Sequence, residues 1–124
     1  MSTPLVDFSF VYEMAEDDTT YIYEVVNLFL NTLSDGMVKL EKLITSEADF
    51  DEIRFQSHFL KSSAKVVKVH GMYDGFLELE ETAREHTGRE KLLPLFNKLK
   101  HTFLEARPEL EKEVARTKQA MAKA

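Results

Sequence analysis

The feature of this sequence with the clearest chemical meaning is a histidine among basic side chains. When the segment around His58 is drawn as a helix of 3.6 residues per turn, the side chains within about 80° of it include Arg54, Lys61, Ser62, Lys65 and Lys68. The stretch from Ile53 to Tyr73 contains four Lys or Arg residues and no Asp or Glu. It therefore carries a charge of +4, while the rest of the chain, with 12 Lys or Arg against 22 Asp or Glu, carries −10.

This pattern suits a histidine that accepts a phosphoryl group. An imidazole attacks as a nucleophile only when it is neutral, and neighbouring cations disfavour the imidazolium form. The same cations favour the negative charge that a phosphoryl group adds to the ring. Ser62, one turn after His58, is small enough to let a partner protein approach the ring closely. The alternative is that His58 is an ordinary exposed histidine on a basic helix, since short motifs also occur without a function.

The remaining sides of the same predicted helix are apolar. Four residues lie opposite His58 and are expected to face the core, with Gln56 and Ser63 at the margins: Ile53, Leu60, Ala64 and Val67. An apolar shoulder beside the histidine consists of Phe55, Phe59 and Val66. We expect this shoulder either to contact a partner protein or to pack against a neighbouring helix.

The elements that must position these residues are predicted to be helices. Only four glycines and three prolines interrupt the 124 residues, and apolar residues recur at steps of three and four. The pattern predicts helices over residues 18–44, 49–69, 72–86 and from between 89 and 94 to 121. We expect an all-α fold, an antiparallel four-helix bundle with a short N-terminal lead-in helix and an extended C-terminal helix. It would be a single domain over residues 1–124, with the bundle core over about 8–107 and a helical tail over 108–124.

Several local signals mark the predicted boundaries and leave alternatives open. Asp17 or Asp18 can cap the first long helix, and Asp49 with a glutamate three residues later resembles a capping box. Residues 8–14 form either an extended lead-in or a short helix. The Ser-Asp-Gly sequence at 34–36 either bends the first long helix or splits it. Pro108 either kinks the last helix or begins a separate segment.

The composition excludes several classes of protein. The chain has 22 Asp or Glu against 16 Lys or Arg, and a net charge of −6 disfavours nucleic-acid binding. Without cysteine there is no disulfide or thiolate metal site, and the apolar runs are too short for a membrane span or a signal peptide. The sequence has no glycine loop that could cradle ATP and no Glu three residues before a histidine. We therefore expect a cytoplasmic protein with no metal site and no cofactor.

The run from His58 to Ala64, His-Phe-Leu-Lys-Ser-Ser-Ala, resembles the signature of histidine-containing phosphotransfer (HPt) domains. In that family the histidine is followed by a leucine two residues later, a lysine three residues later and small residues, on an exposed helix. The acidic turn at 16–18, the Phe-Leu pair at 29–30 and the Leu-Glu-Leu-Glu run at 77–80 match the family layout as well. The resemblance covers residues 8–103, most of the chain.

The resemblance implies a four-helix bundle whose histidine accepts a phosphoryl group from the aspartyl phosphate of a receiver domain. By this similarity His58 is the phosphorylated residue and Lys61 is a charge partner of the phosphoryl group. The family often has a Gln or Glu near the imidazole on the next helix, and without gaps this position is Glu80. Glu80 would accept a hydrogen bond from Nδ1 and present Nε2 for attack, or it is a solvated glutamate. Ser62 and Lys68 stand where the family usually has glycines.

The sequence thus predicts a histidine phosphocarrier of a two-component phosphorelay rather than an enzyme, with a response-regulator receiver domain and a hybrid sensor histidine kinase as partners. The predicted partner surface surrounds His58: Arg54, Phe55, Phe59, Ser62, Lys65, Val66 and Lys68. Mg²⁺ would be held by the acidic pocket of the receiver. We expect a monomer that binds neither membranes nor nucleic acids. The alternatives are an adaptor or inhibitor that binds a receiver or kinase without being phosphorylated, and an unrelated helical interaction module.

Overall fold

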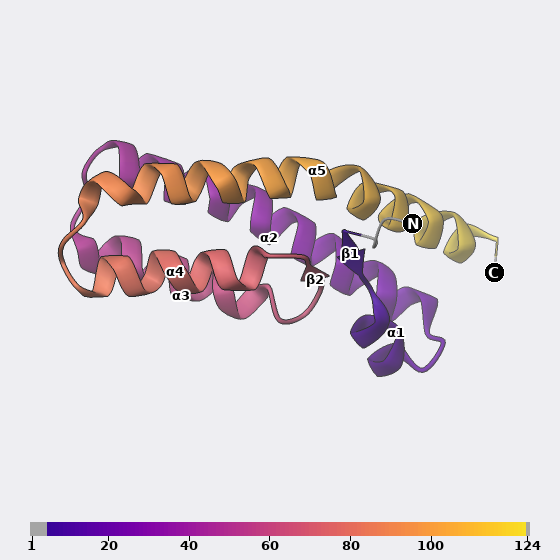
Figure 1. Cartoon of the computed structure of the whole chain (residues 1–124). Coiled ribbons are helices and arrows are strands. Elements are labelled where there is room, and N and C mark those ends of the chain that lie inside the picture. Colours follow the sequence, from indigo (N-terminus) through magenta and orange to yellow (C-terminus); the bar gives the residue numbers. More distant parts are fainter. Residues whose placement is uncertain (1–4, 124) are drawn as a thin grey trace.

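The computed structural model describes residues 5–123 and shows a helical bundle (Figure 1). Its elements in chain order are β1 (Val6–Asp7), α1 (Ser9–Ala15), α2 (Thr19–Thr45), α3 (Phe50–Ser63), β2 (Lys68–Val69), α4 (Met72–Arg84) and α5 (Arg89–Ala122). The predicted all-α fold is confirmed, with α2 to α5 as the bundle, α1 as the lead-in helix and α5 as the extended C-terminal helix. Residues 1–4 and 124 of the predicted domain lie outside the described residues.

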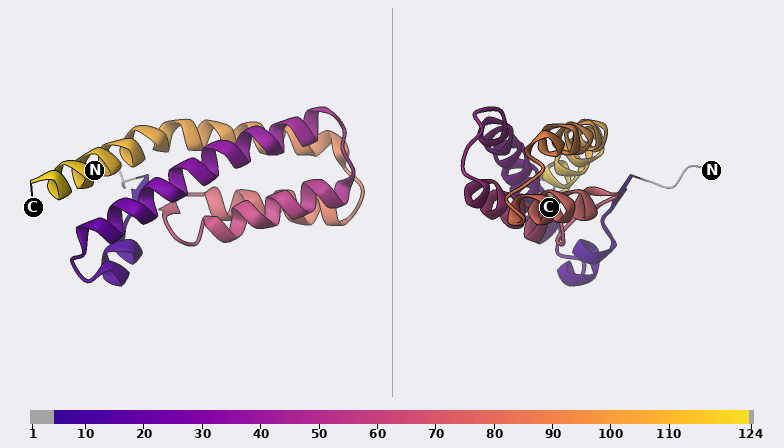
Figure 2. Two further views of the ribbon diagram at one scale, coloured as in Figure 1. Left: turned by 180° about the vertical axis from the view of Figure 1, so that it is seen from behind. Right: turned by 60° about the vertical axis from the view of Figure 1, so that its left-hand side comes forward.

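The four long helices bury one continuous apolar core. Helices α3 and α4 lie side by side, while α2 and α5 are longer and extend beyond them toward the end that holds α1 and the two strands (Figures 1 and 2). Each of the four long helices contributes fully buried side chains, among them Leu33, Ile53, Phe76 and Phe96. The end of α5 also packs, since Leu110 and Thr117 are fully buried.

None of the helices among residues 5–123 is long and apolar enough to cross a membrane.

The helix starts follow the predicted caps, and α2 is not split. The Asp18 carboxylate accepts a hydrogen bond from the Tyr21 amide at 3.2 Å, and that of Asp49 accepts one from the Asp51 amide at 2.8 Å. Helix α2 runs without a break through Gly36, which is buried against α3. A Cβ atom at Gly36 would lie 2.4 Å from Leu60 Cδ2, so the glycine permits the close approach of α2 and α3.

Helix α3 ends at Ser63, and the prediction of a helix to Val69 is wrong. Instead, Val69 pairs with Val6 in a two-stranded antiparallel sheet, and the amide of His70 donates to the carbonyl of Leu5 at 2.9 Å. The apolar spacing through Val67 fits a helix, but the β-branched Val67 and Val69 are both buried without one, Val67 in a bend before β2 and Val69 within β2. Strand pairing therefore overrides the helical pattern.

Helix α5 is continuous through both of its prolines. Pro108 does not begin a separate segment, because the helix runs from Arg89 to Ala122. Pro108 is exposed, and so is Leu104, whose carbonyl loses a helical hydrogen bond. Solvent can satisfy that carbonyl, which explains why the helix tolerates the residue.

Candidate phosphotransfer site

His58 lies on the exposed side of α3 and contacts α4 through a buried glutamate. Its Nδ1 atom is 2.9 Å from Oε1 of Glu80. The histidine side chain is 56% exposed, whereas that of Glu80 is only 2% exposed. Glu80 is therefore not a solvated glutamate. The imidazole is exposed to solvent on one side and contacts a buried carboxylate on the other.

Two cations hold the Glu80 carboxylate from the other sides. Lys61 Nζ is 2.7 Å from Oε2, and Arg84 Nη2 donates to Oε1 at 3.1 Å. Burial raises the pKa of Glu80, but the hydrogen bonds and charges of Lys61 and His58 outweigh it, so the pKa lies below its ordinary value of 4.5. The carboxylate is consequently ionised at neutral pH and can only accept hydrogen bonds.

The geometry fixes the tautomer of the neutral histidine. Because an ionised carboxylate only accepts, the single ring proton lies on Nδ1 and is donated to Glu80. The lone pair of a neutral ring is then on Nε2. The arrangement presents a nucleophilic nitrogen on a half-exposed ring.

Lys61 lies deeper than its predicted role as a charge partner of the phosphoryl group suggests. Its side chain is 13% exposed and forms an ion pair with Glu80. Much of its charge is therefore balanced by the carboxylate. Its action on a phosphoryl group stays a prediction.

Arg84 belongs to the same cluster and was not predicted. It lies one turn after Glu80 on α4, and its side chain is 60% exposed. In the sequence the pair of Glu80 and Arg84 is marked only by its spacing of four residues. Such pairs are common on helix surfaces, so the spacing alone does not indicate a site. Once Glu80 is known to be buried beside His58, the exposed guanidinium becomes a cation at the edge of the site.

The residues of the predicted basic face do not all belong to α3. Lys65 and Lys68 follow Ser63, so the prediction that they lie on the same helix as His58 is wrong, while their part in a partner surface stays a prediction. Lys65 Nζ lies 5.9 Å from the centre of the Tyr73 ring, and Lys68 is in β2 opposite Asp7. The basic residues that α3 itself contributes are Arg54, which is 3.7 Å from Asp51, and Lys61.

The predicted apolar shoulder is exposed and extends onto α2. The exposed fractions of Phe55 and Phe59 on α3 are 69% and 47%. Val66 has left the helix but stays beside it and lines an apolar cleft of about 200 Å³ between α2 and the end of α3. Leu28 of α2, 67% exposed, lines the same cleft. Ser62, the small residue one turn after His58, is exposed as well.

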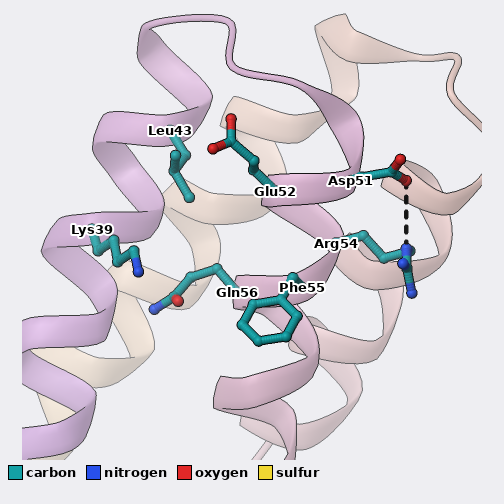
Figure 3. A pocket seen from close by; sticks show the side chains of 7 residues that line it. All are labelled: Lys39, Leu43, Asp51, Glu52, Arg54, Phe55 and Gln56. Carbon is teal, nitrogen blue, oxygen red and sulfur yellow. Dashed lines mark ion pairs between the residues drawn. The ribbon is translucent and has the colours of Figure 1, made fainter.

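A second cleft flanks the shoulder on the side away from the end of α3. It measures about 390 Å³ and lies between α2 and the first turns of α3 (Figure 3). Phe55 and Arg54 line it together with Lys39 of α2, and Gln56 reaches across to donate to the Gly36 carbonyl at 3.2 Å. His58 is not among its lining residues. This cleft therefore adjoins the apolar shoulder at Phe55 and does not enclose the histidine.

Comparison with known proteins places the chain in a family. The family model described as Hpt domain matches residues 24–120, most of the chain, and the protein therefore belongs to the Hpt domain family. Membership supports a histidine phosphotransfer role in a phosphorelay, in which HPt proteins interact with receiver domains and kinases. The resemblance found in the sequence is confirmed.

Two solved structures show the same fold. One is a rice protein assigned as a histidine-containing phosphotransfer protein, with a TM-score of 0.79 and 20% identity over 93% of this chain and 83% of that chain. The other is a histidine-containing phosphotransfer protein from maize, with a TM-score of 0.80 and 20% identity over 95% of this chain and 88% of that chain. No curated protein matches the sequence.

Proposed function

We propose that this protein is a phosphocarrier that takes a phosphoryl group from the aspartyl phosphate of one receiver domain and passes it to another. The phosphoryl group is carried on Nε2 of His58. The observation that carries the proposal is the contact between His58 Nδ1 and the ionised, buried Glu80, which leaves the lone pair on Nε2 of a half-exposed ring.

The transfer is an in-line displacement at phosphorus. Nε2 forms the new P–N bond while the P–O bond of the aspartyl phosphate breaks, and the bonding electron pair returns to the aspartate carboxylate. Glu80 stabilises the positive charge that develops on the ring. Lys61 and Arg84, which both contact Glu80, supply positive charge on the side of the ring that Glu80 holds, and Mg²⁺ in the acidic pocket of the receiver would neutralise charge on the phosphoryl group.

The receiver docks on the apolar shoulder and its extension onto α2. Exposed large apolar side chains around a polar centre are typical of a protein interface. They are Leu28, Phe55, Phe59 and Val66. Arg54 and Arg84 flank the histidine and face the acidic pocket of the receiver, which favours encounter with the correct orientation. Ser62 leaves room for the receiver backbone.

The test uses a receiver domain that has been phosphorylated with labelled acetyl phosphate and then freed of the donor. Mixed with this protein, it should lose its label to the chain, and the label should be acid-labile and alkali-stable. The variant His58→Gln should accept none, while His101→Gln, which alters an exposed histidine of α5, should behave as the wild type. Tight binding without label transfer would instead identify an adaptor, and no binding to any receiver would exclude the phosphorelay role.

A further inference from the structure

The hydrogen bond between His58 and Glu80 constrains the phosphorylated state of the ring. Before phosphorylation, Nδ1 carries the proton and Nε2 the lone pair. A phosphoryl group on Nε2 uses that lone pair. The phosphorylated ring then either keeps the Nδ1 proton, as a phosphoimidazolium, or loses it and has a bare lone pair at Nδ1.

Glu80 favours the first of these two forms. Its Oε1 atom lies 2.9 Å from Nδ1, and an ionised carboxylate has no proton to donate. A bare Nδ1 would place two acceptors against each other inside a site where Glu80 is almost fully buried, whereas a protonated Nδ1 keeps its hydrogen bond. A glutamine at this position could turn its NH₂ group toward a bare Nδ1, but a glutamate cannot.

We propose that Glu80 keeps Nδ1 protonated throughout the cycle, so that phosphorylated His58 is held as the phosphoimidazolium, the form that releases its phosphoryl group fastest. This inference rests on the proposed function, because it concerns the phosphorylated state of the same histidine. It makes Glu80 a positioning residue that sets how long the phosphoryl group stays on the chain.

The charge on the leaving ring explains the speed. In the onward step the P–Nε2 bond breaks, its electron pair returns to Nε2, and a carboxylate oxygen of the next receiver forms the new P–O bond. In hydrolysis a water oxygen forms that bond and releases a proton to solvent. With Nδ1 protonated the leaving group is neutral imidazole, whereas without this proton it is imidazolate, a far stronger base and a poorer leaving group. The carrier is therefore built to forward the group rather than to store it.

The other charges near the ring do not reverse this effect. Helix α3 contributes Arg54 and Lys61, and α4 contributes Glu80 and Arg84, while α2 packs on another side of α3, where Leu60 meets Gly36. Lys61 and Arg84 both disfavour a cationic ring, but each is paired with Glu80. Glu80 touches the ring itself, and the phosphoryl group adds negative charge at the opposite nitrogen.

The test labels the protein chemically, without a kinase or a receiver. Phosphoramidate transfers a phosphoryl group to histidine, and ³¹P NMR follows both the protonation of the labelled ring and its hydrolysis between pH 6 and pH 9. In Glu80→Gln the midpoint of ring protonation should fall by about one pH unit. Above both midpoints the label should last about tenfold longer than in the wild type, because one pH unit is a tenfold change in the protonated fraction. Equal midpoints and lifetimes would overturn the proposal.

Two further variants control the experiment. Glu78→Gln makes the same charge change on the exposed side of α4 and should leave midpoint and lifetime unchanged. Arg84→Gln removes a cation that shares Oε1 with His58, so its midpoint should rise and its label should be shorter-lived, and it replaces Glu80→Gln should that variant unfold. An unchanged or lowered midpoint in Arg84→Gln would contradict the proposal.

The outcome is separable from that of the proposed function. A chain that is labelled by phosphoramidate and shows the predicted lifetimes, but exchanges no phosphoryl group with receivers, refutes the carrier role alone. A chain that exchanges with receivers but has equal lifetimes in wild type and Glu80→Gln refutes this inference alone. Failure of phosphoramidate to label His58 in the folded protein would refute both.

Discussion

Glu80 and Glu113 each bind an aromatic ring and an arginine, but they lie in different parts of the molecule and hold different rings. Glu80 joins α3 to α4 through His58 and Arg84, with Lys61 as a third partner. Glu113 on α5 accepts hydrogen bonds from Tyr12 of α1 and from Arg116. The Glu80 side chain is 2% exposed and that of Glu113 is 12% exposed.

The chemistry of the two rings separates a reactive site from a structural contact. Neutral imidazole that donates from Nδ1 still has a lone pair on Nε2 and is therefore a nucleophile. Burial and the neighbouring Glu113 raise the pKa of Tyr12, so its hydroxyl keeps its proton and donates it to the carboxylate. Arg116 Nη2 donates to the same hydroxyl at 2.6 Å, which leaves Tyr12 fully engaged.

Similar interactions therefore serve two purposes in one chain. At Glu80 they orient and activate a ring that a partner can reach. At Glu113 they fasten the lead-in helix to the extended part of α5, which is why the tail beyond the bundle is packed rather than free.

Among variants that test the difference between the Glu80 and Glu113 clusters, Lys61→Ala is expected to have the largest effect on stability and on phosphoryl transfer. The substitution removes a cation that lies 2.7 Å from the buried Glu80 carboxylate and leaves His58 and Arg84 as its partners. It should lower the free energy of unfolding by about 2 kcal/mol. It should also slow phosphoryl transfer, because positive charge near the phosphoryl group is lost. Urea unfolding and the rate of label transfer from a receiver measure the two effects.

The matched control for that experiment is Lys112→Ala, which removes an exposed lysine of α5. It should change neither stability nor transfer appreciably. If Lys61→Ala behaved like this control, Lys61 would have no part in the site.

A smaller effect, confined to stability, is expected from Tyr12→Phe. The variant loses the hydroxyl that Glu113 and Arg116 share, and the free energy of unfolding should fall by about 1 kcal/mol. Thermal unfolding measures this loss, with Tyr21→Phe, an exposed tyrosine of α2, as the control. Phosphoryl transfer should stay at the wild-type rate, and a slowed transfer would show that the two clusters are not separate.

Local signals in the sequence were sufficient for most of the fold. The caps at Asp18 and Asp49 and the helical apolar spacing depend on residues within a few positions of one another, which sequence patterns report directly. The exposure of His58 and the turn of α4 that faces it follow from the same periodicity once the family layout is recognised. The structure confirms these two placements, and the roles of the residues stay predictions.

What the sequence did not show depends on partners far away in the chain. The end of α3 is set by pairing between Val69 and Val6, and helical spacing up to Val67 hides it. The bond between Tyr12 and Glu113 spans 101 positions. Arg84 could be assigned to the site only once Glu80 was known to be buried. An ion pair of the same spacing between two exposed side chains is common and does not indicate a site.

The central claim is that Glu80 holds the Nδ1 proton of His58 and thereby makes Nε2 the nucleophile. The most direct measurement is NMR of ¹⁵N-histidine-labelled protein after transfer of a phosphoryl group from a receiver, in which one-bond coupling between ³¹P and ¹⁵N identifies the nitrogen that carries phosphorus. We predict coupling to Nε2 of His58, with Nδ1 protonated. Coupling to Nδ1 would contradict the account, because that nitrogen would then have to give up its contact with Glu80.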